Sequence, residues 1–212
     1  MLDDLRIERY ARHILLREVG GVGQERILSS TVEVEGLGEA GCWAATYLAL
    51  AGVGRLLLVD PRPVPAGGLG PLLPFSEEGR PRDRAAAASI GALNPDVVTS
   101  VGAPVPGEMR EIAETVRLGG DGIQGVYLVA TRGERAVGGW IDGHECVACV
   151  EAALEAEDAS GTAPPAAALA GSTAASEILA AILQQAPRRR GLWLHRLGEP
   201  EAIGACPHGD AA

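Results

Sequence analysis

The spacing of hydrophobic and polar residues changes period along the first third of the chain. Val32 and Val34 alternate with polar residues, which predicts a strand with one buried face. The apolar run over 42–50 has the length and composition of a helix, and the run over 56–59 is short enough for a second buried strand. The pattern therefore predicts a strand–helix–strand unit over residues 32–60.

The same alternation of helix and strand continues to the end of the chain. It predicts an α/β fold with a Rossmann-like, doubly wound and mostly parallel sheet, with helices on both faces. Ligands of such sheets bind beyond the carboxyl ends of the strands, here near residues 60 and 130. The further expected elements are helices over 83–93, 108–118 and 166–185, and strands over 97–101, 126–130 and 192–197.

The first thirty residues are predicted to form a helical arm. A helix is expected over 3–17, and a glycine-broken link at 20–23 leads into a short second helix. The apolar side of the first helix would consist of Leu5, Tyr10, Ile14 and Leu15. We therefore divide the chain into an N-terminal helical arm, 1–30, and a Rossmann-like nucleotide-binding domain, 31–212, whose tail carries candidate zinc ligands.

Charge and hydropathy limit the partners of the chain. The formal net charge of −10 argues against nucleic acid, because phosphate binding needs a basic surface. We find no apolar run of the roughly 18 residues that a membrane-spanning helix needs, and the N-terminus MLDDLRIERY lacks a signal-peptide core. A cytoplasmic protein without a membrane partner is expected, with four cysteines serving as thiols or metal ligands.

The first turn of the strand–helix–strand unit carries candidate nucleotide ligands. Gly36, Gly38 and Gly41 form a G-x-G-x-x-G pattern, which lets backbone N–H groups approach a phosphate at a helix N-terminus. Asp60 ends the second strand, where an acid accepts hydrogen bonds from ribose hydroxyls. The alternative is a tight strand–helix turn that binds nothing.

A longer pattern around this unit resembles one protein family. The segment RYARHILLREVGGVGQERI, the glycine-rich unit and AGVGRLLLVD together resemble the ThiF/MoeB family of ubiquitin-activating-enzyme-like adenylyltransferases. The likeness is dense over 9–64 and returns at 91–96. It implies that ATP binds and that the C-terminal carboxylate of a small ubiquitin-like protein attacks its α-phosphate. It also implies that Arg12 reaches the ATP of a neighbouring subunit, although Arg12 could instead form an ordinary surface ion pair.

Several positions depart from the pattern of that family. Arg62 replaces a second acid, an Arg-Gln pair is absent, and the Lys of the next helix is matched only by Arg82, whose planar guanidinium differs from a compact ammonium. In the family, Mg²⁺-binding acids end the strand that here ends in Ala130-Thr131-Arg132-Gly133-Glu134. No carboxylate stands at the metal position, and nothing in the sequence directs the nearby Glu134 to the site, which argues against Mg²⁺. The segment that follows is short, so the C-terminal half of the sheet is expected to be truncated.

The cysteines form a second candidate site. The resemblance implies a structural Zn²⁺ far from the nucleotide, held by two pairs of ligands. Cys146 and Cys149 match one pair, and Cys206 with His208 replaces the other, a donor set that suits tetrahedral zinc. Alternatively, Cys146 and Cys149 pack as small apolar side chains on a helix. Cys42, just after the glycine-rich turn, is expected to be buried.

The expected function is that of a divergent ThiF/MoeB-like protein. Its fold would bind ATP and activate the C-terminus of a ubiquitin-like sulfur-carrier protein or peptide, as a homo- or heterodimer. Weak or lost activity in the isolated chain is expected because groups that stabilise charge at the phosphates are missing. The alternative is a non-catalytic subunit that pairs with an active homologue or presents a peptide to a partner enzyme. A third alternative, an ordinary nucleotide-dependent oxidoreductase, does not explain RYARH and GVGQER.

Overall fold

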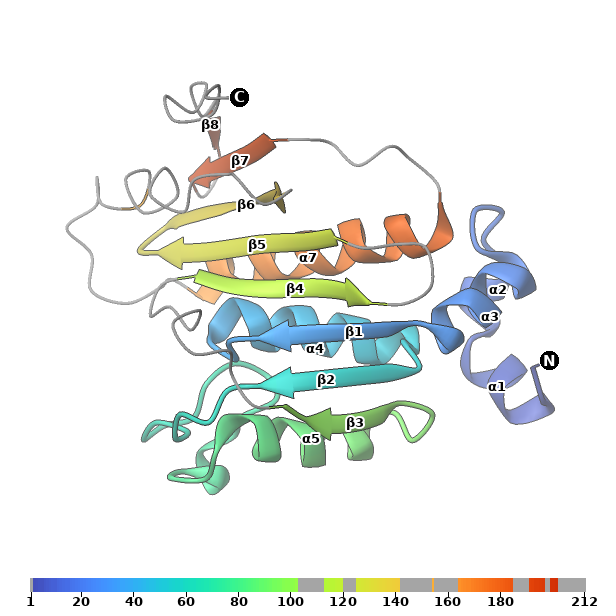
Figure 1. Cartoon of the computed structure of the whole chain (residues 1–212), viewed down its shortest axis with the longest axis horizontal. Coiled ribbons are helices and arrows are strands. Elements are labelled where there is room, and N and C mark those ends of the chain that lie inside the picture. Colours follow the sequence, from blue (N-terminus) through green and yellow to red (C-terminus); the bar gives the residue numbers. More distant parts are fainter. Residues whose placement is uncertain are drawn as a thin grey trace.

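The protein is an α/β domain built on one eight-stranded sheet (Figure 1). A computed structural model describes residues 2–102, 113–119, 125–141, 154, 164–184, 191–196 and 199–201. The strands are β1 (Thr31–Glu35), β2 (Arg55–Val59), β3 (Val98–Val101), β4 (Ala113–Gly119), β5 (Gly125–Arg132), β6 (Arg135–Ile141), β7 (Gly191–Arg196) and β8 (Glu199–Glu201). The helices are α1 (Asp4–Arg9), α2 (Ala11–Ile14), α3 (Gly20–Ser29), α4 (Glu39–Ala51), the 3₁₀ turn η1 (Phe75–Glu77), α5 (Arg82–Leu93) and α7 (Pro164–Leu183). The predicted α/β fold is therefore confirmed.

One half of the sheet is parallel. The strand order is β3-β2-β1-β4-β5-β6-β7-β8, and β1 pairs in parallel with β2, as β2 does with β3. Val32 lies opposite Leu56 and Val34 opposite Leu58, and all four side chains are fully buried. The predicted strand–helix–strand unit is thus present, with α4 as its helix.

The other half of the sheet is antiparallel, so the parallel part is narrower than predicted. Each of the strands β5 to β8 pairs antiparallel with the strand before it, and β4 pairs antiparallel with β1. The connection from β5 to β6 is a two-residue turn in which Gly133 has φ of +56°. Such a turn can join only antiparallel neighbours.

The helix expected over 108–118 is wrong where the structure describes that segment. Residues 113–119 form β4, between β1 and β5. The period of two in Thr115-Val116-Arg117-Leu118 is that of a strand, and Val116 is fully buried.

Helices α4, α5 and α7 form one layer on the same face of the sheet, whereas the sequence predicts helices on both faces. Helix α4 packs against α5 and against α7 (Figure 1). The first two crossovers step in the same direction along the sheet, and their right-handedness places both helices on one face. Gly171 of α7 allows close packing, because a Cβ there would meet the Ala40 carbonyl and lie 2.5 Å from Trp43 Cβ.

The N-terminal arm consists of α1, α2 and α3 at the amino end of β1 and β2 (Figure 1). The single helix predicted over 3–17 is interrupted at Tyr10, whose φ and ψ are −102° and 15°. Tyr10 is buried, whereas Leu5 and Leu15 are 74% and 84% exposed. The predicted apolar side of the arm is therefore wrong for these two leucines, because the break at Tyr10 places the residues on either side on different helices.

The expectation that no apolar segment reaches membrane-spanning length is wrong for helix α7. It has 20 residues, and by length and composition alone it could cross a membrane. In the fold it packs against α4, β5 and β6, and half of its most apolar window is buried. The core helix of a globular fold has the same length and composition, so α7 is weak support for a membrane segment.

Candidate functional site

The glycine-rich turn lies between β1 and the start of α4, at the carboxyl edge of the parallel strands. Gly36 has φ of +84°, a conformation that glycine adopts without strain, and its N–H donates to the Val59 carbonyl at 2.9 Å. Gly38 is the N-cap residue of α4, and Gly41 is buried in its first turn. The turn therefore brings the three predicted glycines to a helix N-terminus, the geometry that suits an anion.

Asp60 follows β2 at the same edge and is completely buried. Its Oδ2 accepts hydrogen bonds from the Leu37 N–H at 2.7 Å and from Arg62 Nη2 at 2.6 Å. Its Oδ1 accepts from the Arg62 N–H at 3.1 Å and from Arg62 Nε at 2.8 Å. Asp60 is the residue predicted to bind ribose, and both of its carboxylate oxygens thus already accept hydrogen bonds from the chain itself.

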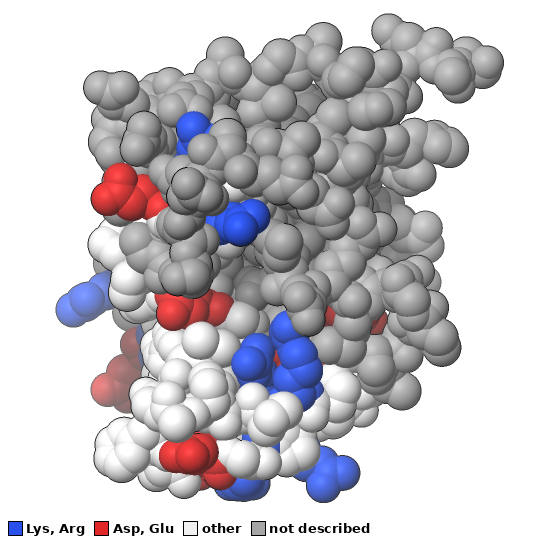
Figure 2. Space-filling view, turned by 90° about the vertical axis from the view of Figure 1, so that its left-hand side faces the viewer, with Lys and Arg blue, Asp and Glu red and all other residues white. Residues whose placement is uncertain are grey.

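Arg82 begins α5 and is a second arginine that approaches Asp60. Its Nη1 is 3.6 Å from Asp60 Oδ2, its Nε donates to the Pro63 carbonyl at 3.1 Å, and its side chain is 15% exposed. Figure 2 shows this edge of the sheet, with blue side chains gathered near the middle of the face and an acidic one beneath them. The chain contains no lysine, so arginine alone supplies permanent side-chain cations here.

The charges around Asp60 determine its protonation. Burial alone would raise the pKa of the Asp60 carboxyl. Hydrogen bonds from Arg62 and from the Leu37 N–H, together with the charges of Arg62 and Arg82, outweigh that effect and hold the pKa below its ordinary value. Asp60 is therefore a carboxylate at neutral pH, paired inside the fold.

The carboxyl end of β5 is the second part of this edge. Because β4 is antiparallel to both β1 and β5, β5 runs in the direction of β1, as predicted for the crevice. Ala130 is 1% exposed, and the first carboxylate after it, Glu134, is exposed in the turn to β6. Within the described residues, no group of three or more His, Cys, Asp or Glu side chains could hold a metal ion.

Two residues at this edge are not predicted as site residues from the sequence, Arg62 and Glu39. The sequence marks Arg62 as a departure from the family pattern and does not identify it as the partner of Asp60. The Asp60-Pro61-Arg62 turn, in which an Asp accepts from the N–H two residues later, is the signal that could have identified it. Glu39 lies in the first turn of α4, and burial raises the pKa of its carboxyl. An acid beside a glycine-rich turn disfavours a phosphate when it is ionised.

Arg12, predicted to contact nucleotide, lies at the opposite end of the chain's own sheet from Asp60. It belongs to α2 in the arm and is exposed. The arm lies at the amino ends of β1 and β2, whereas Asp60 follows the carboxyl end of β2 (Figure 1). The structure therefore brings together Gly36, Gly38, Gly41, Asp60 and Arg82 but not Arg12.

The motif residues of the arm form a polar network with the C-terminal end of α4. Gln24 is fully buried, donates to the Ala51 carbonyl at 2.9 Å and lies 3.1 Å from His13 Nδ1. Asn94 donates to Tyr10 Oη at 3.0 Å and to the Ala49 carbonyl at 2.7 Å. These contacts dock the arm onto the helix, so these residues have a structural role.

Asp96 extends this network to α1. Its carboxylate accepts from Tyr10 Oη at 3.2 Å and forms ion pairs with Arg6 and Arg9 at 3.4 and 3.0 Å. Because both arginines are more than a third exposed, solvent screens these ion pairs and each contributes little. The Asn94-Pro95-Asp96 motif therefore joins α5 to the arm.

Of the cysteines, the structure describes Cys42. It is fully buried and its Sγ lies 3.7 Å from the Leu37 carbonyl, as expected for a small packed side chain. The predicted metal ligands lie outside the described residues; they are Cys146, Cys149, Cys206 and His208.

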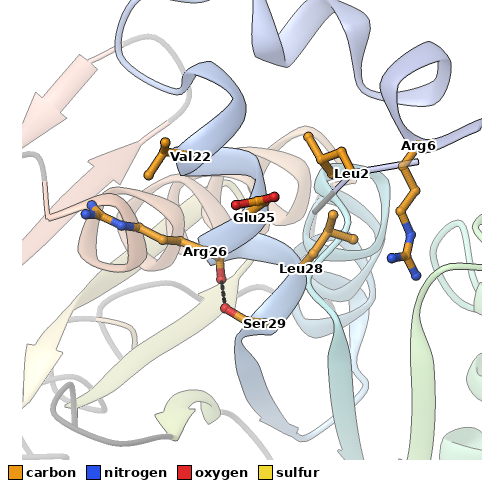
Figure 3. Close-up of a pocket in the computed structure, with 7 residues that line it drawn as sticks. All are labelled: Leu2, Arg6, Val22, Glu25, Arg26, Leu28 and Ser29. Carbon is orange, nitrogen blue, oxygen red and sulfur yellow. Dashed lines mark hydrogen bonds between the residues drawn. The ribbon is translucent and has the colours of Figure 1, made fainter. Parts of the chain in front are cut away.

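A pocket of about 430 Å³ lies on the outer side of α3, between that helix and the first residues of the chain (Figure 3). Arg6 and Arg26 line it on different sides, with Glu25 between them and the Arg26 side chain extending away from Arg6. Ser29 Oγ donates to the Arg26 carbonyl at 2.9 Å. The pocket contains none of the predicted site residues and lies at the arm end of the molecule.

Comparison with known proteins identifies the family. The model of the ThiF family matches residues 10–127, more than half of the chain. The chain belongs to the ThiF family. It is 44% identical over 98 residues to the SAMP-activating enzyme E1 of Haloferax volcanii, a match that covers 45% of this chain and 36% of that protein. It is 39% identical over 98 residues to the sulfur carrier protein ThiS adenylyltransferase of Escherichia coli, covering 45% and 39%.

Solved structures of similar fold extend the likeness to nearly the whole chain. Escherichia coli MccB, crystallised with succinimide, has a TM-score of 0.68 at 14% identity, and covers 94% of this chain and 72% of its own. PaaA has a TM-score of 0.67 at 21% identity, and covers 96% and 85%. At these identities the likeness shows the fold alone. The matches to curated relatives span little more than a third of the length of those proteins.

Proposed function

We propose that this ThiF-family chain binds ATP and the C-terminal segment of a ubiquitin-like carrier protein or peptide, and transfers adenylate weakly or not at all on its own. The observation that carries the proposal is the carboxyl end of β5. Ala130 is buried there, and the chain turns at Gly133 into β6 with no carboxylate before the exposed Glu134.

The chemistry of nucleotide activation supports this proposal. Transfer from ATP develops negative charge that Mg²⁺ and cationic side chains normally neutralise. At this edge one of the two arginines is paired bidentately with Asp60, and the other lies 3.6 Å from the same carboxylate. Removing one group that stabilises the developing charge typically lowers the rate by about 10²–10³.

The relatives support the substrate class. One of them is named a SAMP-activating enzyme E1 and another an adenylyltransferase of the sulfur carrier ThiS. Both names refer to the activation of a protein, which makes a carrier C-terminus the first substrate to test for this chain.

Pyrophosphate exchange with ATP, Mg²⁺ and a panel of carrier proteins ending in Gly-Gly tests the proposal. We expect exchange close to background with the chain alone and measurable binding of a carrier by calorimetry. The Escherichia coli ThiS adenylyltransferase with ThiS serves as the positive control. Robust exchange by the chain alone would show that other residues have taken over the metal site.

A second candidate function is that of a non-catalytic subunit in a homo- or heterodimer. The exposed leucines of the arm favour it, since Leu5 and Leu15 are 74% and 84% exposed. In such an assembly Arg12 would act on the nucleotide of the neighbouring subunit. We expect sedimentation to give a dimer that Leu5→Glu weakens and that Phe75→Glu does not, because Phe75 lies outside the arm and is 74% exposed, as Leu5 is. A monomer of about 22 kDa at micromolar concentration would contradict this candidate.

We also propose a structural zinc ion held by Cys146, Cys149, Cys206 and His208. Three thiolates and one imidazole form a donor set that zinc prefers. Metal analysis of protein purified without chelator should give close to one zinc per chain, and Cys146→Ser should lower both the zinc content and the melting temperature. Cys42→Ser serves as the control for zinc content because Cys42 is buried against the Leu37 carbonyl.

A further inference from the structure

We propose that Arg62 is a plug in the nucleotide site: it occupies the acceptor positions of Asp60 that would otherwise bind the ribose of a nucleotide. The inference rests on the proposed function only in treating the carboxyl edge as the nucleotide site. In this proposal Arg62 determines whether the site can distinguish nucleotides by their ribose hydroxyls, and Asp60 stabilises the fold through its pairing with Arg62.

The first argument is a count of acceptor positions. A carboxylate has two oxygens with about four lone-pair sites. Asp60 receives four hydrogen bonds within 3.1 Å, one from the Leu37 N–H and three from Arg62. Arg82 Nη1 lies a further 3.6 Å from Oδ2. A ribose hydroxyl can therefore bind Asp60 only if Arg62 withdraws.

The second argument is that the main chain around Arg62 is fixed. Its N–H donates to Asp60, and its carbonyl accepts from the Arg82 N–H at 2.9 Å. Pro61 and Pro63 stand on either side of it and restrict φ at both positions. The main chain of Arg62 therefore has little freedom to move, and it holds the guanidinium next to Asp60.

The third argument is the energetic asymmetry between the two partners. Asp60 is fully buried, whereas the Arg62 side chain is 32% exposed. Withdrawal of the Arg62 guanidinium would leave the buried carboxylate with the N–H groups of Leu37 and Arg62 and the more distant Arg82. Breaking a buried ion pair in this way is strongly unfavourable. A ribose hydroxyl, which is neutral, does not replace the lost charge.

The surroundings of the glycine-rich turn are closed in a similar way. Glu39 lies in the first turn of α4, and burial raises the pKa of its carboxyl. Gly70, in the glycine-rich segment before η1, packs so closely against this turn that a Cβ there would be 2.8 Å from Cys42 Cβ. The chain thus fills acceptor positions on the ribose side of the site and places Glu39 and Gly70 beside its helix side.

The test is calorimetric titration with ATP and with 2′,3′-dideoxy-ATP, without metal. If Arg62 is a plug, the wild-type chain does not distinguish the two nucleotides. Arg62→Ala should bind ATP about tenfold more tightly than the wild type and about tenfold more tightly than the dideoxy analogue, since hydrogen bonds to a charged group have this strength. Arg84→Ala, which removes an exposed arginine of the same helix as Arg82, should behave as the wild type.

Three results would overturn the proposal. A wild-type preference for ATP over the dideoxy analogue would show that Asp60 already binds ribose. A loss of ATP affinity in Arg62→Ala would make Arg62 a phosphate ligand, and an unchanged affinity would leave it no role at the site. If Arg62→Ala does not fold, Arg62→Lys keeps the charge without the fork, and the absence of any gain in ATP preference in that variant overturns the proposal. None of these readouts needs a carrier protein, so they are independent of the pyrophosphate exchange.

Discussion

Tyr10 lies against Gly52 so closely that a Cβ atom on the glycine would be 2.5 Å from Tyr10 Oη. Gly52 is the C-cap of α4 with φ of +85°, and its N–H donates to the Ala49 carbonyl at 3.0 Å. The arm therefore contacts the end of α4 through the Tyr10 ring, which packs on the main chain of Gly52.

Gly52→Ala tests this contact. The substitution combines a left-handed conformation, which costs an L-residue about 1–2 kcal/mol, with displacement of the Tyr10 ring. Gly79→Ala is the matched control, because Gly79 has φ of +78° and open space around the Cβ position. In urea unfolding we expect Gly52→Ala to lose at least about 1 kcal/mol more than Gly79→Ala. Equal losses would mean that the tyrosine contact is unimportant.

The crossing of α4 and α7 gives a second pair of glycine substitutions. At Gly171 a Cβ would lie 2.5 Å from Trp43 Cβ, so Gly171→Ala should cost about 1–3 kcal/mol by forcing the helices apart. Gly91 of α5 has nothing within 4 Å, so Gly91→Ala should instead stabilise the fold by up to about 1 kcal/mol through helix propensity. Thermal unfolding followed by circular dichroism measures both. The same sign for the two variants would contradict this prediction.

The polar network under the arm should show coupling between its members. Asn94 donates to Tyr10 Oη at 3.0 Å, so the losses of Tyr10→Phe and Asn94→Ala should not add. We expect a coupling energy of about 0.5 kcal/mol or more from urea unfolding of the two single variants and the double variant. Tyr10→Phe combined with Ser89→Ala is the control, because the Ser89 hydroxyl donates to the Leu72 carbonyl at 2.7 Å and not to a member of the network. Additivity in both cycles would argue against the network.

The lowered pKa of Asp60 predicts that the free energy of unfolding depends on pH. Its pKa in the folded state lies below the unfolded value of 3.8, so its stabilising contribution is complete above that value and is lost as the pH falls toward the folded pKa. Asp60→Asn should therefore lower the free energy of unfolding by about 3 kcal/mol at pH 7, and by progressively less below about pH 4. Urea unfolding of both proteins between pH 7 and pH 3 measures this difference. A difference that stays constant across that range would show that the charge of Asp60 does not stabilise the fold.

The parallel half of the fold could be predicted from local sequence. Val32 and Val34 alternate, the glycines mark the turn, and the strand before Asp60 is a short apolar run. All of these signals lie within one strand–helix–strand unit and describe neighbours in the chain. The helix expected over 108–118 overlooks the short period of two in residues 115–118. The place of β4 between β1 and β5 is decided by pairing with distant residues, which local propensity does not report.

The sequence predicts which residues of the candidate site lie near one another, but it does not predict the hydrogen bonds that they form. The glycines, Asp60 and Arg82 do meet at one edge, as strand order and motif spacing indicate. The sequence does not indicate that Asp60 points its oxygens at Arg62, because the pairing depends on the turn that Pro61 and Pro63 impose. The role proposed for Arg12 requires a second subunit.

The arm and the carboxyl edge lie at opposite ends of β1 and β2, and this distance bears on how the family can evolve. The residues by which this chain is recognised as a relative include Tyr10, Gln24 and Asn94, and these brace one end of the sheet. The groups at Asp60 and at the end of β5 lie at the other end of the sheet. A lineage could thus exchange reactive groups at the carboxyl edge one by one while the marks of its ancestry in the arm stayed in place.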